Sequence, residues 1–218
     1  MKRIFSLVFS LTLFTAYNSQ ASISFLVQSD LLKDAGGTAM SQSGLVLFVA
    51  STSDATFDSV VAGSSTSIGS SLNGGDDKIL FKTNLASYGV NGVLDAATGA
   101  LDLSSVGGWT TGDPLALLWF PTLTNASATI EGNTPYGFYR RSSAVDGTQA
   151  WVTPADPTNN YLLGFFTQDG AELSPGGAAA NLAAAGNASL TVGAIPEPSR
   201  SLLGLLGLGV LALRRRRS

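Results

Sequence analysis

Short apolar runs alternate with polar, turn-forming residues between positions 22 and 194 of the chain. Eight of these runs have the length and the β-branched or aromatic content of strands. They are 23–28, 45–50, 79–82, 115–120, 136–140, 151–153, 162–167 and 189–192. Turn signals such as Asn91-Gly92 and Asp146-Gly147 stand between them. Many short strands joined by such turns predict an all-β domain, an antiparallel β-sandwich or barrel.

Two of the runs, 45–49 and 115–120, are apolar at every position rather than at alternate ones. This pattern predicts central strands that are buried on both faces, although short apolar runs also occur in helices. Residues 51–71 are rich in Ser, Thr and Gly, which predicts a long mobile loop. Helical turns are candidates near 30–33, 85–87 and 181–185, and residues 174–186 have the composition of a linker.

The composition removes several classes of chemistry. The chain contains no Cys and no His, so thiolate and imidazole metal sites and His-dependent catalytic triads are excluded. Between residues 22 and 194, fourteen acidic and five basic side chains leave a charge of −9. An acidic domain is a poor nucleic-acid binder, because binding needs a basic face. We therefore expect no nucleic-acid partner.

The N-terminus has the three parts of a secretory signal. Lys2 and Arg3 precede an apolar run over 4–17, and small side chains at Ser19 and Ala21 follow it. We place the signal peptide at 1–21, with cleavage by signal peptidase between Ala21 and Ser22. An uncleaved anchor and a buried N-terminal helix are the alternatives, but the run is short for a membrane span.

The C-terminus, residues 195–218, combines three different parts. Pro196, Glu197 and Pro198 enforce an extended strip that an enzyme groove could bind. The uncharged stretch 202–213 is rich in Leu and Gly. As a helix it would rise ~18–20 Å, against a hydrocarbon core of ~30 Å, which favours a transient membrane anchor over a durable transmembrane helix. The positive-inside rule places the cluster that follows on the cytoplasmic side. That cluster consists of Arg214, Arg215, Arg216 and Arg217.

This order of parts resembles the PEP-CTERM sorting signal, with Ile195 where Val is commoner. The resemblance covers only about the last two dozen residues. It implies recognition by exosortase, an integral-membrane transpeptidase-like enzyme, in a Gram-negative bacterium that makes exopolysaccharide. It further implies transient inner-membrane association, processing near the motif, and delivery to the cell surface or extracellular matrix, as in biofilms. The same tail is also catalogued as an ice-binding protein C-terminal domain, but no repeated Thr array supports ice binding here.

The central domain, 22–194, offers three weak candidates for chemistry. Asn73-Gly74-Gly75-Asp76-Asp77 could supply oxygen ligands to Ca²⁺, and Asp102 and Asp113 flank a second Gly-rich loop. A solvated turn is the alternative at each of these places. Glu131 and Glu172 are its only glutamates, and a glycosidase needs two carboxylates ~5–9.5 Å apart. Surface charge is the alternative for both glutamates.

Aromatic side chains are the third candidate, because exposed rings stack on sugars. Trp109 lies in a Gly-rich loop where exposure is plausible, and core packing is the alternative for every ring of the group. The group consists of Trp109, Trp119, Trp151, Tyr136 and Tyr139.

We assign no catalytic, metal or cofactor residues, and we expect a non-enzymatic, exported cell-surface or matrix protein with exopolysaccharide as a candidate partner. A carboxylate-dependent secreted hydrolase and a Ca²⁺-dependent glycan-binding module are the alternatives.

Overall fold

The structure is a computed structural model that describes residues 22–29, 32–73, 75–142, 150–155, 160–165, 171–172, 175 and 186–193. The predicted signal peptide, 1–21, and sorting tail, 195–218, lie outside the described residues. The candidate helical turn at 181–185 also lies outside them. Within the described part of the chain, no helix is long and apolar enough to cross a membrane.

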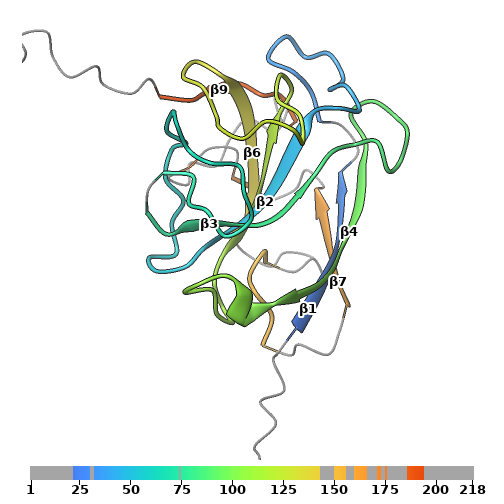
Figure 1. The fold of residues 1–218 in the computed structure, drawn as a ribbon. Helices are drawn as coiled ribbons and strands as arrows, with labels where there is room; N and C mark the ends of the chain where they lie inside the picture. Colours follow the sequence, from blue (N-terminus) through green and yellow to red (C-terminus); the bar gives the residue numbers. More distant parts are fainter. Residues whose placement is uncertain are drawn as a thin grey trace, which may run out of the picture.

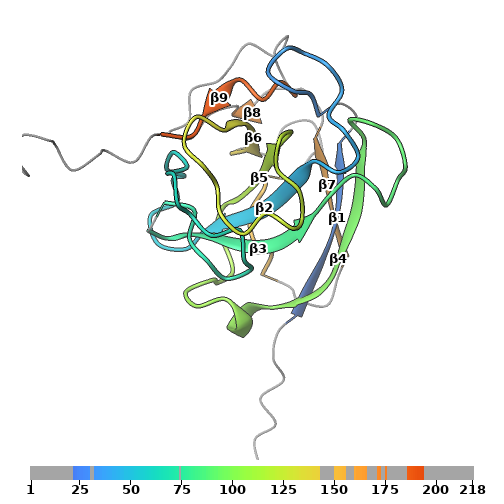
Figure 2. The same ribbon diagram turned by 45° about the horizontal axis from the view of Figure 1, so that its top comes forward.

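In the described part of the chain, nine strands form two sheets (Figures 1 and 2). The smaller sheet has the order β4-β1-β7. Its strands are β1 (Ser22–Ser29), β4 (Leu94–Asp102) and β7 (Asn160–Phe165). The larger sheet has the order β3-β2-β5-β6-β8, and β9 pairs with β6 outside this path. Its strands are β2 (Leu45–Ser51), β3 (Asp77–Thr83), β5 (Leu115–Phe120), β6 (Pro135–Arg141), β8 (Ala171–Glu172) and β9 (Leu190–Thr191).

The all-β prediction is confirmed in the part of the chain that the structure describes. Its one helical element there is the 3₁₀ turn Leu103–Ser105. Residues 85–89 form a turn rather than the predicted helix, because the amides of Tyr88 and Gly89 both bond the Leu85 carbonyl and Gly89 has φ +77°. Lys33, at the end of another predicted helical turn, bridges Ala39 and Asn187 in extended form.

The strand pairing departs from the antiparallel prediction at one place. β1 pairs antiparallel with β4 but parallel with β7. A parallel pair needs a long crossover connection, and more than a hundred residues separate β1 from β7 in the chain. Sequence patterns specify which faces are apolar but not the direction in which a distant strand joins the sheet.

The strand prediction also differs from the structure in two details. β4 was not predicted, because its sequence is rich in Ala and contains Gly99, and both residue types have low strand propensity. Gly99 adopts φ +69°, and the β1–β4 register shifts between Ser24 and Leu26, beside the bond from Phe25 N to Thr98 Oγ1 (3.0 Å). The predicted strand at 151–153 is reduced to a single bridge between Pro114 and Val152.

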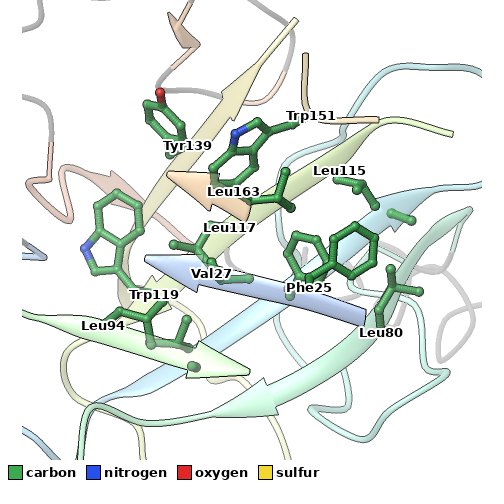
Figure 3. Packing of buried hydrophobic residues seen from close by; sticks show 14 of the residues in the cluster. Phe25, Val27, Leu80, Leu94, Leu115, Leu117, Trp119, Tyr139, Trp151 and Leu163 are labelled. Atoms are coloured by element: carbon green, nitrogen blue, oxygen red, sulfur yellow. The ribbon is translucent and has the colours of Figure 1, made fainter. Parts of the chain in front are cut away.

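The first hydrophobic cluster lies between the two sheets (Figure 3). β1 contributes Phe25 and Val27, and in Figure 3 the Val27 side chain lies beside Leu117 of β5. Phe25 also meets Phe48 of β2 edge to face, with ring centroids 5.1 Å apart. The two sheets therefore pack face to face through large side chains from both.

The second cluster lies on the other face of the larger sheet. Residues 52–76, which we call the cover loop, pack Phe57, Val60 and Leu72 against this face. The Phe57 ring meets Phe138 edge to face at 5.5 Å. The predicted mobile loop is thus a packed cover, because its few apolar residues are spaced to reach the sheet. The prediction that β2 and β5 are buried on both faces is confirmed.

Among the described residues, both clusters draw on positions between Ile23 and Val192. The range 22–194 therefore contains every described side chain of the two cores.

Candidate functional site

Carboxylates gather where the cover loop returns to the start of β3. We call this place the acidic corner, and its members are Asp54, Asp58, Asn73, Asp76 and Asp77. It contains the stretch in which the sequence offered candidate Ca²⁺ ligands. Asp77 is the first residue of β3 and Asp76 comes just before it, and the environments of these two neighbouring aspartates differ sharply.

Asp76 is enclosed by donors from the beginning of the cover loop. Its Oδ2 accepts hydrogen bonds from Ser53 Oγ (2.7 Å), Ser53 N (3.1 Å), Ser51 Oγ (3.2 Å) and Asp54 N (3.3 Å). These bonds, led by that from the Ser53 hydroxyl, hold the pKa of Asp76 below its usual value. Asp76 is therefore an ionised carboxylate whose Oδ2 is already occupied by the protein's own donors.

Asp77 is buried, with only 2% of the residue exposed. Its Oδ2 accepts bonds from Asp58 N (2.8 Å) and Asn73 Nδ2 (2.9 Å), whereas Oδ1 has no hydrogen-bond partner among the described residues. Burial raises the pKa of Asp77 to about 7. The hydrogen bond from Asp58 N acts in the opposite direction and lowers this pKa, while the negative charges of Asp76, Asp58 and Asp54 raise it further.

The side-chain amide of Asn73 lies between two carboxylates of the acidic corner and occupies the position that a cation would need. Its Nδ2 also donates to Asp58 Oδ2 (3.1 Å), and the bond from Gly75 N to Asn73 Oδ1 (2.8 Å) fixes this orientation. An N–H group, rather than an oxygen, thus lies between the carboxylates of Asp58 and Asp77. Among the described residues, no group of three or more acidic side chains is placed to hold a metal ion.

The other two candidate carboxylates close turns. Asp102 Oδ1 accepts bonds from Ser104 N (2.8 Å) and Ser104 Oγ (2.9 Å) at the start of the 3₁₀ turn. Asp113 accepts bonds from Thr110 N (2.7 Å) and Thr110 Oγ1 (3.1 Å). These local bonds are typical of Asp at helix N-termini and turns.

The two glutamates lie at opposite ends of β6. Glu131 belongs to the turn just before Pro135, and Glu172 forms an ion pair with Arg140 (3.0 Å) near the last residue of the strand. Five residues of strand span ~16 Å, more than the ~5–9.5 Å between the carboxylates of a glycosidase. The structure does not bring them together as a catalytic pair.

Of the two alternatives for the aromatic group around Trp109, the structure favours core packing over an exposed sugar platform. All five candidate rings are buried, and Trp109 itself is only 3% exposed. Its indole Nε1 donates to Thr153 Oγ1 (2.8 Å), while that of Trp119 donates to the Lys33 carbonyl (3.1 Å). Both indole N–H groups therefore have hydrogen-bond acceptors inside the fold, which offsets the cost of burying them.

The sequence reasoning missed Tyr88, which is 53% exposed in the turn between β3 and β4. Gln42 Nε2 holds this turn through the Gly89 carbonyl (2.9 Å). Gly92 has φ +76°, and a Cβ there would lie 2.9 Å from the Leu32 carbonyl oxygen, so only glycine fits. The available signal was an aromatic residue in an uncharged turn, Ala86-Ser87-Tyr88-Gly89-Val90.

Comparison with protein-family models, with curated proteins and with solved structures finds no match to this chain. The functional argument therefore rests on the residues and on their arrangement.

Proposed function

We propose that this is an exported cell-surface or extracellular-matrix protein of a Gram-negative bacterium, sorted through its C-terminal tail by an exosortase-like membrane enzyme. The order of the parts is the observation that carries the proposal. An export signal at 1–21 precedes a folded β domain, and Pro196-Glu197-Pro198, an apolar stretch and an Arg cluster follow it. The domain, a β-sandwich of two facing sheets, performs structural or binding work.

The use of the carboxylates supports a non-catalytic role for the domain. Asp76, Asp102 and Asp113 accept hydrogen bonds that shape loops. Asp77, which shares the Asn73 amide with Asp58, has a raised pKa, but it is buried and so is shielded from substrate. A hydrolase would need an accessible pair.

The sorting tail is tested by two changes, Glu197→Ala and deletion of residues 214–217. The first removes the charged centre of the motif, and the second removes the charges that stop translocation. In a host with exosortase we expect both variants to accumulate as precursor, seen as a larger species in the membrane fraction on immunoblots. Ser199→Ala, one residue beyond the motif, is the matched control and should mature normally. Normal maturation of both test variants would contradict the proposal.

The binding role is tested by co-sedimentation of the chain 22–194 with the producing organism's exopolysaccharide. Among the described residues, Tyr88 is the aromatic side chain exposed enough for sugar stacking. We therefore expect Tyr88→Ser to weaken binding about fivefold, equivalent to ~1 kcal/mol. Ile68→Ser removes a similarly exposed apolar side chain (58%) from the cover loop and should bind as the parent does.

The same sedimentation experiment separates the alternatives. Saturable binding that survives a chelator favours a Ca²⁺-independent matrix protein, while loss of binding on chelation favours the Ca²⁺-dependent glycan-binding module. Absence of binding in both conditions would leave a self-associating structural protein, to be tested by its assembly.

A further inference from the structure

Two aspartates at the start of β3 tie down the cover loop at different points. Asp76 accepts bonds from Ser53 and Asp54, where the loop leaves β2. Asp77 accepts bonds from Asp58 and Asn73, which lie further along the loop and at its return. Beneath the loop lies the apolar outer face of the larger sheet. The bonds to Asp77 therefore help to keep that face covered.

The two oxygens of Asp77 suit a carboxylic acid better than a carboxylate. Oδ2 can accept both of its hydrogen bonds in either state, since a protonated carboxyl group keeps its acceptor capacity. Oδ1 is buried and has no hydrogen-bond partner among the described residues. A proton on Oδ1 makes the group neutral, whereas ionisation leaves a buried charge without a further partner, which is costly.

The charged groups around Asp77 favour the neutral form. The cover loop contributes Asp54, Asp58 and its last residue, Asp76. The nearby cations are engaged elsewhere, since Lys78 Nζ donates to Ser71 Oγ (2.7 Å). From β6, Arg140 donates to the Ala55 carbonyl (3.2 Å), pairs with Glu172, and lies 5.4 Å from the centroid of the Phe57 ring.

We propose that the carboxyl group of Asp77 is a proton-operated latch, which holds the cover loop on the larger sheet when protonated and releases it when ionised. Release uncovers part of the second hydrophobic cluster, including the sites of Phe57 and Val60. The proposal concerns the folded domain and is independent of its sorting and of its ligand.

The direction of the pH dependence follows from linkage. The pKa of Asp77 is about 7 in the folded protein, against 3.8 for a free aspartate side chain. The stability gained from the bound proton is complete below pH 3.8, decreases as pH rises toward 7, and is absent above that range. The cover loop should therefore be held more tightly in acid than at alkaline pH.

The test uses Asp77→Asn in the chain 22–194. Asparagine keeps an oxygen acceptor for Asp58 N and Asn73 Nδ2, and its own NH₂ group takes the place of the acid O–H. It cannot ionise, so it should behave as a permanently closed latch. The measurement is hydrogen exchange of the cover-loop amides at pH 5.5 and 8, expressed as protection factors relative to the intrinsic rate at each pH.

We expect wild-type protection in the cover loop to fall at least ~10-fold from pH 5.5 to pH 8, since one pKa unit corresponds to a tenfold change in the equilibrium. Protection in β1 should change little, and Asp77→Asn should remove the pH dependence of the loop. Asp95→Asn, which removes a carboxylate on the smaller sheet, should behave as the wild type does.

Three results would overturn the latch: unchanged wild-type protection, a pH dependence that persists in Asp77→Asn, or an equal loss in β1, which would mean global unfolding. If the variant does not fold, the carboxyl ¹³C shift of Asp77 in the wild type decides. A midpoint near pH 7 supports the latch, and a midpoint near pH 4 contradicts it.

Discussion

Replacing Gly137 by alanine is expected to destabilise the domain by more than ~3 kcal/mol, at or above the upper end of overpacking effects. Gly137 of β6 pairs directly with Trp119 of β5, and the buried indole lies over the glycine. A Cβ at Gly137 would overlap the ring atoms of Trp119. The ring cannot move easily, because it is packed between the sheets and its Nε1 bonds the Lys33 carbonyl.

Urea unfolding followed by far-UV circular dichroism measures this loss. Gly107→Ala is the matched control, because a Cβ at Gly107 meets nothing within 4 Å and its φ is not in the left-handed region. That control should be neutral or slightly stabilising, by up to ~1 kcal/mol, since alanine restricts the unfolded chain.

A second background identifies the cause. In a Trp119→Leu protein the clash is removed, so Gly137→Ala should then cost less than ~1.5 kcal/mol. An equal loss in both backgrounds would show that the need for glycine at position 137 comes from the backbone and not from the indole.

The strands that sequence reasoning finds are those whose burial is extreme. β5 is apolar at every position, and β2 is apolar as far as Ala50, because the smaller sheet covers one face and loops cover the other. β4 is missed because its strand role depends on a long-range partner, β1, and not on its own residues. Its Ala and Gly residues would equally suit a loop.

The acidic corner shows why site chemistry is harder to predict than strands. Asp76 and Asp77 are adjacent and identical in type, yet one has a lowered pKa and the other a raised pKa. The difference depends on the burial of Asp77 and on the donors to Asp76, which lie more than twenty residues away in the chain. Composition reveals the cluster of acids but not which of them is buried.

The rings show the same limit. Trp109 stands in a Gly-rich loop that suggested exposure, but Thr153, forty-four residues later in the chain, accepts its indole N–H inside the fold. Tyr88, in a loop of similar composition, has no such cover and is exposed. Local sequence does not distinguish the two, because burial is decided by residues brought from elsewhere in the chain.

Replacing Phe25 by alanine is expected to cost ~3–5 kcal/mol, because it removes a fully buried aromatic ring from between the sheets. The ring contacts Phe48 of the opposite sheet, and Tyr161 of β7 lies at a centroid distance of 6.3 Å. Leu26→Ala is the matched control. It changes the next residue on β1, which faces away from the core and is only half-buried, so its loss should stay below ~1.5 kcal/mol.

A double-mutant cycle with Phe48→Ala separates ring contact from cavity formation, with an expected coupling of ~0.5–1.5 kcal/mol for the edge-to-face pair. Equal losses for Phe25→Ala and Leu26→Ala would contradict the packing of the two sheets. The loss matters in a domain without Cys, since no disulfide can compensate for a weakened core. The free energy of unfolding of a typical domain is ~5–15 kcal/mol, so the loss of one ring from this interface would remove a large part of the stability of the fold.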